Sequence, residues 1–271
     1  ATTLTNTTFG GTWSSSSTSV ATIGSLTGAV TTGAPGTTTI TYTTAAGCTA
    51  TAVLTVNASP GVISGNVPVC VLSSTTLSSL PTGGTWVSSN TSLATIGSAS
   101  GIMTGVASGN PTITYTLPTG CSITAVATIN ALPAAVTGAG SICVGGSLLL
   151  SDATTGGTWS SLAPGVASVV AGSGLVSVVS AGTATIVYTL RTGCTASAVV
   201  TVNTAAGAIT GTAVGCGGFS SVLSSSPAGG TWSSSNTSMA TIGSLTGSVN
   251  AIAAGNPVIT YTLGTGCFST M

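Results

Sequence analysis

The sequence repeats itself every 73 residues, and this period constrains the fold more than any other feature. Tryptophan stands at 13, 86, 159 and 232, tyrosine at 42, 115, 188 and 261, and cysteine at 48, 121, 194 and 267. Three more cysteines, at 70, 143 and 216, keep the same step. Because the copies align without insertion or deletion, the chain is a tandem array of one unit, and its function belongs to the array rather than to a single pocket.

The period sets the expected domain boundaries. We divide the chain into repeats at 1–58, 59–131, 132–204 and 205–271. The first copy lacks the stretch that matches 59–73, and the last lacks the stretch that matches 53–58. We therefore expect the chain to be part of a longer array. The alternative is a chain whose incomplete ends complete each other between subunits by strand donation.

The pattern within one repeat predicts short strands and no helix. In the second copy, Thr112-Ile-Thr-Tyr-Thr-Leu117 alternates with a period of two, which places Ile113, Tyr115 and Leu117 on one face. Gly, Ser, Thr and Val dominate, whereas good helix formers are rare. Short strands separated by Gly, Ser and Asn are typical of a two-sheet sandwich. We predict strands at 60–65, 70–77, from 83 onward, and at 93–96, 102–107, 112–117 and 121–130.

Charge is almost absent, and this excludes several classes of function. Asp152 and Arg191 are the only ionised side chains, and the chain has no Lys, Glu or His. Nucleic-acid binding needs Lys and Arg, and calcium sites need several carboxylates. General acid–base catalysis needs groups that titrate near neutral pH. We therefore expect no enzyme activity, no cofactor, no metal and no nucleic-acid partner. Asp152 and Arg191 each occur in one repeat only, so we assign them no site.

The apolar content argues against disorder, since 42% of the residues are apolar. No apolar run approaches the length of a membrane span. A net charge of zero favours self-association. We therefore expect a surface that is covered by glycans or that packs against other copies.

The cysteines indicate an oxidising compartment. The simplest connectivity is one bridge within each repeat, Cys70 with Cys121, Cys143 with Cys194 and Cys216 with Cys267, which leaves Cys48 unpaired. A bridge that closes about 50 residues would stabilise a unit by roughly 4 kcal/mol. The alternative is reduced, buried or metal-binding cysteines, although two per repeat without His are too few for a closed zinc site.

A row of threonines points away from the predicted core, and we consider it a candidate site for O-linked glycans or for packing against another chain. A plain solvated sheet face is the other interpretation, and ice contact is a further one. Asn-linked glycan patterns at 6, 57, 90 and 236 do not recur in every copy. The row consists of Thr39, Thr41, Thr43, Thr112, Thr114, Thr116, Thr260 and Thr262.

The motif Gly-Gly-Thr-Trp-Ser-Ser-Ser-Asn-Thr-Ser-Met-Ala-Thr-Ile-Gly at 229–243, followed by Gly-Asn-Pro-Val-Ile-Thr-Tyr-Thr-Leu at 255–263, resembles the bacterial Ig-like domain, group 2. The added Gly-Cys before the last strand is similar to versions in very large secreted surface proteins of Bacteroidota. The resemblance implies immunoglobulin-like sandwiches in stalks, adhesins and other cell-surface arrays. The near absence of surface charge departs from the usual pattern of the family.

We therefore expect a structural segment of an extracellular bacterial fibre or cell-surface stalk. The linkers around 57–60, 130–133 and 203–206 are short, which favours restricted bending between repeats. The expected partners are neighbouring repeats of the same chain, other copies in a fibre and covalent glycans. The alternative is an adhesin that binds glycans or a host surface through its repeats or a distal tip.

Overall fold

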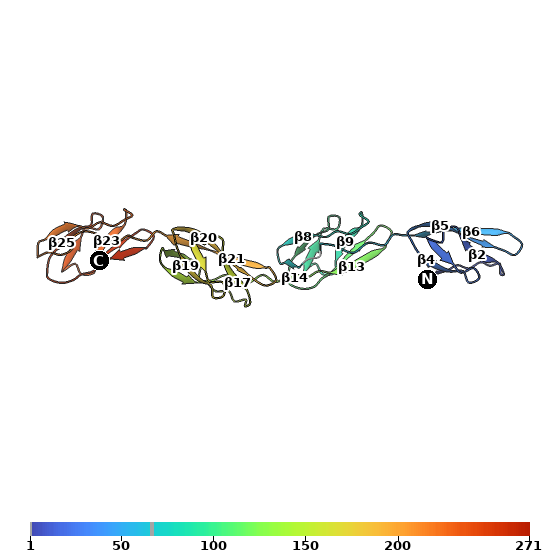
Figure 1. The fold of residues 1–271 in the computed structure, drawn as a ribbon, viewed down its shortest axis with the longest axis horizontal. Coiled ribbons are helices and arrows are strands. Elements are labelled where there is room, and N and C mark those ends of the chain that lie inside the picture. Colours follow the sequence, from blue (N-terminus) through green and yellow to red (C-terminus); the bar gives the residue numbers. More distant parts are fainter. Residues whose placement is uncertain (1, 66–67) are drawn as a thin grey trace. The chain divides into compact units, whose positions relative to one another are not determined.

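The computed structural model describes residues 2–65 and 68–271, and within these ranges the regular structure is all β-strand, with no helix (Figure 1). The all-β prediction is therefore confirmed. The chain divides into two compact units, Ala1–Ala131 and Leu132–Met271. The finer division into repeats stays a prediction.

The third repeat contains the most continuous strands. One sheet has the order β16-β19-β18, and the other has the order β15-β21-β20-β17. The strand β15 runs parallel to β21, whereas the other neighbours are antiparallel. The strands are β15 (Ser141–Cys143), β16 (Ser147–Leu149), β17 (Thr158–Ser161), β18 (Ala167–Val169), β19 (Leu175–Val178), β20 (Gly182–Thr189) and β21 (Thr195–Asn203).

The second repeat has the same sheets with more interruptions. Its sheets have the orders β10-β11-β8, β13-β12-β9 and β14-β7. The strands are β7 (Val69–Cys70), β8 (Ser74–Thr76), β9 (Thr85–Ser88), β10 (Ala94–Ile96), β11 (Ile102–Gly105), β12 (Thr112–Thr116), β13 (Ser122–Val126) and β14 (Ile129–Asn130).

Three predicted strands of this repeat are only partly right. The stretch 60–65 forms an isolated bridge between Ser64 and Ser78 rather than a strand. The stretch 70–77 is broken, because Leu72 has a φ of 66° and turns the backbone between β7 and β8. The stretch 121–130 is divided into β13 and β14. Alternation alone does not detect such breaks, since the residues on either side keep the apolar pattern.

The first and fourth repeats have two three-stranded sheets each, with the orders β1-β4-β3 and β2-β5-β6, and β22-β25-β24 and β23-β26-β27. Their strands are β1 (Thr2–Thr3), β2 (Thr12–Ser15), β3 (Ala21–Ile23), β4 (Ala29–Thr32), β5 (Gly36–Thr43), β6 (Thr49–Val56), β22 (Ser220–Val222), β23 (Thr231–Ser234), β24 (Ala240–Ile242), β25 (Ser248–Ala251), β26 (Ile259–Thr262) and β27 (Phe268–Thr270).

The core of the third repeat lies between its two sheets. On β20 the buried residues Ala184, Ile186 and Tyr188 alternate with half-buried ones, as a strand with one inward face requires. They pack against residues of the facing sheet such as Val176, which is fully buried. The sandwich therefore follows from the period-two pattern that the sequence shows.

The Gly-Gly-Thr-Trp motif has a structural role that recurs in every copy. In the third repeat, the N–H of Gly157 donates to the hydroxyl of Tyr188 at 2.9 Å, and this hydroxyl donates to the carbonyl of Thr154 at 2.7 Å. The ring of Tyr188 lies 4.7 Å from that of Trp159, centroid to centroid. A Cβ on Gly157 would lie 2.5 Å from the tyrosine ring, so glycine is required there. The motif thus fixes the start of β17 to its neighbouring strand β20 in the same sheet.

Candidate functional site

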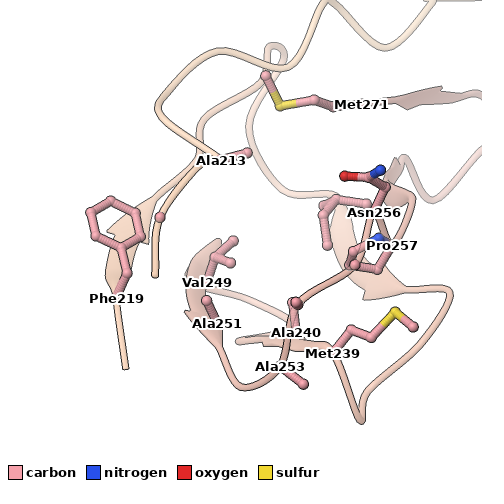
Figure 2. A pocket seen from close by; sticks show the side chains of 14 residues that line it. Ala213, Phe219, Met239, Ala240, Val249, Ala251, Ala253, Asn256, Pro257 and Met271 are labelled. Atoms are coloured by element: carbon pink, nitrogen blue, oxygen red, sulfur yellow. The ribbon is translucent and has the colours of Figure 1, made fainter. Parts of the chain in front are cut away.

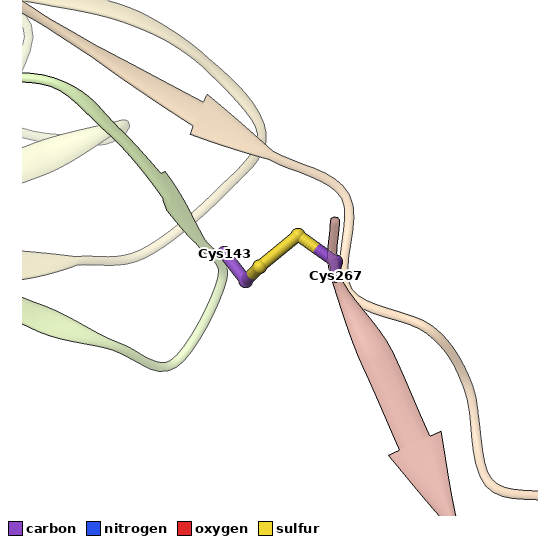
Figure 3. Close-up of a disulfide and its surroundings, with 2 residues drawn as sticks. All are labelled: Cys143 and Cys267. Carbon is purple, nitrogen blue, oxygen red and sulfur yellow. A yellow bond between two sulfur atoms is a disulfide. The ribbon is translucent and has the colours of Figure 1, made fainter. Parts of the chain in front are cut away.

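The cysteine pairing differs from the one that we predicted. Cys143, at the end of β15, forms a disulfide with Cys267, which immediately precedes β27, and the two Cα atoms are 5.7 Å apart (Figure 3). The bridge therefore joins the third repeat to the fourth. The predicted pairs Cys143–Cys194 and Cys216–Cys267 are wrong.

The register of the strands explains why the pairing within a repeat fails. Parallel pairing places Cys143 opposite Asn203, at the far end of β21. Cys194 stands just before the start of β21, nine positions earlier. At about 3.3 Å per residue this separation is roughly 30 Å, whereas disulfides need Cα atoms within about 7 Å. The two cysteines of one repeat thus lie at opposite ends of the sandwich.

The second repeat has the same geometry, because Cys70 pairs with Asn130 on β14 and lies far from Cys121. Cys121 has a free thiol, so the predicted Cys70–Cys121 bridge is also wrong. Cys48 and Cys216 are free and exposed, as we predicted for Cys48 alone. Cys70 and Cys194 are disulfide-bonded.

The predicted threonine row lies on the central strands of the sheets that contain the tryptophans. Its members on β5, β12 and β26 are all half-buried, because strands flank them on both sides. In the first repeat, Thr41 pairs with Ser14 on β2 and with Thr51 on β6. The three hydroxyl residues therefore lie side by side across the outer face of the sheet. We call the outer face of this sheet, in each repeat, the hydroxyl face.

The more accessible hydroxyls of this face belong to a column that sequence reasoning missed. The members lie next to the central strands, are all exposed and recur with the 73-residue period: Thr51, Thr124, Ser197 and Thr270. The register pairs them with central-strand residues, as in Thr114 with Thr124 and Thr260 with Thr270. The 73-residue period of these hydroxyl residues is visible in the sequence. The strand register was needed to show that they share one face with the threonine row. Whether either set carries glycans stays a prediction.

The fourth repeat contains a cavity of about 290 Å³ (Figure 2). It lies where a β-strand packs in the third repeat, so we do not interpret it as a ligand pocket. Gly255 and Pro257 line it. Their equivalents in the third repeat, Gly182 and Ala184, pair with Val202 and Val200 of β21, which are buried. The sandwich of the third repeat thus fills the equivalent place with its own last strand. Its apolar lining includes Val249 and Ala251 of β25, Phe219, Met239 and Met271.

The tryptophans and Asp152 take structural positions in the described part of the chain. Trp86, Trp159 and Trp232 are buried against their tyrosines and do not offer a surface for stacking sugars. Asp152 accepts the N–H of Thr154 through Oδ1 at 2.7 Å, while its Oδ2 is buried without a hydrogen-bond partner among the described residues. Within 2–65 and 68–271, no three His, Cys, Asp or Glu residues gather as metal ligands would.

Asp152 departs from the two repeats beside it. Ser79 and Ser225, at the same position, donate to the carbonyls of Gly61 at 2.8 Å and Gly207 at 2.9 Å. An ionised carboxylate cannot make this donation. The substitution therefore removes a hydrogen bond from the third repeat.

In the part of the chain that the structure describes, no helix is long and apolar enough to cross a membrane.

Residues 221–271 match the model of the bacterial Ig-like domain (group 2). This match confirms the resemblance that the Gly-Gly-Thr-Trp pattern indicated. The Ig-like repeats and the disulfides together fit a structural or adhesion-type extracellular repeat protein. No curated protein matches the chain.

Several solved structures have some similarity to this chain. A C-terminal 282-residue fragment of intimin, in complex with the intimin-binding domain of its translocated receptor, is 19% identical with a TM-score of 0.38, and the match covers 54% of this chain and 65% of that fragment. Domains 1–6 of the surface layer protein SbsC are 18% identical, with a TM-score of 0.23 and coverage of 96% and 49%. The human desmocollin-1 ectodomain is 11% identical, with a TM-score of 0.25 and coverage of 99% and 75%.

Proposed function

We propose that this array of Ig-like repeats is a structural segment of an extracellular bacterial fibre or cell-surface stalk. The observation that carries the proposal is the disulfide between Cys143 and Cys267, which belong to consecutive repeats. A bridge within a domain stabilises that domain alone. A bridge between domains also limits how far one can bend or separate from the other, which is what a load-bearing array needs.

The bridge also closes a long loop. Its two cysteines are 124 residues apart in the sequence, and closing a loop of this length is worth about 5 kcal/mol in the chain-entropy model. Both repeats benefit, because neither can unfold and extend fully while the covalent link persists. Because the chain has almost no charge, little Coulomb energy is available for salt to screen, and the stability of the array should depend little on ionic strength.

We further propose that O-linked glycans cover part of the surface, and the hydroxyl face supports this. The exposed column Thr51, Thr124, Ser197 and Thr270 offers one accessible hydroxyl on each repeat. Exposed valines neighbour this column, such as Val126, which is 58% exposed, and Val199, which is 56% exposed. Sugars on the hydroxyls would cover this apolar surface, which in a chain without net charge otherwise favours aggregation.

The location of the native protein tests the structural role. Gold-labelled antibodies against the chain, applied to intact cells of the source organism, are expected to mark rows that extend outward from the cell surface in electron micrographs. Label found only inside permeabilised cells would refute the proposal. Intact mass measurement of the native protein, before and after removal of O-linked sugars, tests the coating.

An adhesin is the second candidate, favoured by the same exposed hydroxyl and valine residues. A glycan array probed with the labelled chain distinguishes the two. Saturable binding that is lost in a Thr51→Glu, Thr124→Glu variant, but kept in a Thr31→Glu control on the opposite sheet, would favour the adhesin. Absence of binding to all sugars leaves the structural role as the better account.

A further inference from the structure

The second and third repeats each have an open cleft at the same place, beside the Trp–Tyr pair. The cleft of the second repeat has a volume of about 410 Å³, and that of the third repeat has a volume of about 340 Å³. We propose that these clefts bind neutral carbohydrates, and that Asp152 makes the cleft of the third repeat the tighter site. This role goes beyond the structural function, which requires no ligand.

The two clefts have the same construction. Each is lined by the loop before the strand of the Gly-Gly-Thr-Trp motif, by the turn between the next two strands, and by the tryptophan and tyrosine of the repeat. Shared lining positions that are 73 residues apart include Leu77 and Leu150, Gly84 and Gly157, Trp86 and Trp159, and Tyr115 and Tyr188. The cleft is therefore a feature of the repeat rather than of one irregular loop.

The tryptophan supplies an open hydrogen-bond donor. Within the described part of the chain, no residue accepts the indole N–H of Trp159. Among the described residues, the only buried side-chain N or O atom without a partner is Oδ2 of Asp152, so this N–H is open to solvent. Gly174 leaves it uncovered, because a Cβ there would lie 3.0 Å from the indole Nε1. Gly101 has the same relation to Trp86, also at 3.0 Å.

Asp152 supplies an open acceptor in the third repeat. It lines the cleft, and its Oδ1 accepts the N–H of Thr154, while its Oδ2 has no partner among the described residues. A carboxylate oxygen that is buried without a donor lowers stability, so a donor from a ligand would be favourable. The exposed hydroxyl of Thr155 lines the same cleft and makes no hydrogen bond to the described residues. It can donate or accept.

These groups match the hydroxyls of a sugar. One sugar ring carries neighbouring hydroxyls that both donate and accept, so it can accept from the indole N–H and donate to the carboxylate together. The indole face packs on the ring of Tyr188 at 4.7 Å between centroids, so the sugar is held by the N–H edge rather than by stacking. Volumes near 340 Å³ are at the lower end for ligand pockets, which suits a small ligand.

The charge of the clefts selects a neutral ligand. Asp152 and Arg191 are the only ionised side chains of the chain, so the cleft of the second repeat has none. In the third repeat, Asp152 would repel an anionic sugar. Loops and turns form most of the walls, so an extended peptide finds no free strand edge with which to pair.

Binding to the full chain tests the proposal. An array of neutral oligosaccharides of glucose, galactose, mannose and N-acetylglucosamine selects the probe, with sialylated and sulfated sugars as charged controls. The selected sugar is then titrated into the isotope-labelled chain, and the indole N–H signals are followed by NMR. We expect saturable shifts of the Trp86 and Trp159 signals, with Trp159 responding at the lower sugar concentration.

Two variants separate binding from folding. Asp152→Ser gives the third repeat the residue that the second repeat has, and it should weaken binding at Trp159 at least about tenfold. The same change is expected to stabilise the repeat, so unfolding cannot explain a loss of binding. Thr155→Val removes the free hydroxyl at nearly constant shape and should weaken binding about threefold. Thr183→Val, which is exposed and outside the cleft, is its matched control and should leave binding unchanged.

A Trp159 signal that no neutral sugar moves at about 10 mM would overturn the proposal. Unchanged affinity in Asp152→Ser, or tighter binding of the charged sugars, would do the same. Binding at the hydroxyl face is a separate outcome, because the variant with Thr51→Glu and Thr124→Glu should keep cleft binding intact. Failure of the clefts to bind would leave the structural function standing, since the antibody labelling on cells does not depend on a ligand.

Discussion

The bridge between repeats makes a mechanical prediction that can be measured on single molecules. We consider a variant that keeps only Cys143 and Cys267, with the other cysteines replaced by Ser. When such a chain is pulled from its two ends, force passes through the disulfide, and the residues between the two sulfurs stay unstretched. These residues account for 124 positions, so oxidation should shorten the fully unfolded chain by about 45 nm, at up to roughly 3.6 Å per residue.

The assay is force spectroscopy by optical tweezers, with and without a reducing agent. A second variant, which restores Cys194, offers Cys143 its alternative partner within the third repeat, 51 positions away. A bridge to Cys194 would shorten the chain by only about 18 nm. We expect the longer step, because the ends of β21 separate Cys143 from Cys194 by roughly 30 Å. An 18 nm step, or the same length in both redox states, would refute the reasoning.

Four further predictions concern stability, and urea unfolding followed by tryptophan fluorescence measures each. Tyr188→Phe removes the hydroxyl that joins Gly157 to Thr154 and should cost about 2 kcal/mol, whereas Thr183→Val, exposed on the same strand, should change stability by less than about 0.5 kcal/mol; equal effects would contradict the anchor. Asp152→Ser restores the donor found in Ser79 and Ser225 and should stabilise the third repeat by about 1 kcal/mol, and a loss of stability would count against this account. Adding Val-Val-Thr-Val-Asn after Met271 should fill the cavity of the fourth repeat and stabilise it by about 3 kcal/mol, while Val-Ser-Thr-Ser-Asn should not. Raising NaCl from about 0.02 M to about 0.2 M should leave the urea midpoint unchanged within roughly 0.1 M, since almost no charge is present to screen, and a larger shift would show that unrecognised charges matter.

The fold was largely predictable, because its determinants are local. The alternation around Ile113 and Tyr115 identifies the inward face of β12, and the same pattern recurs one period later on β20. The fixed position after Gly-Gly-Thr predicted the place of Trp86, Trp159 and Trp232 in the core, whereas Trp13 is only half-buried. The positive φ of Leu72 was not predictable, since leucine rarely adopts this conformation and only the surrounding turn imposes it.

The candidate site was predictable only in part. The threonine row was found from alternation, but the more exposed hydroxyls, such as Thr51 and Thr124, were missed. Which residues share a face with a given strand depends on register across strands, and register is a property of the pairing rather than of one segment. The strand partners of Thr41 therefore had to be observed.

The sequence by itself determined the array: the 73-residue unit, its strands, its apolar faces and its lack of charge are written in residue types and their spacing. The tertiary structure alone decided how the sulfurs connect. Cys143 and Cys194 belong to one repeat, and proximity along the chain suggested that they pair. The parallel alignment of β15 with the end of β21 carries Cys143 to the opposite end of the sandwich, where Cys267 of the next repeat is within bonding distance.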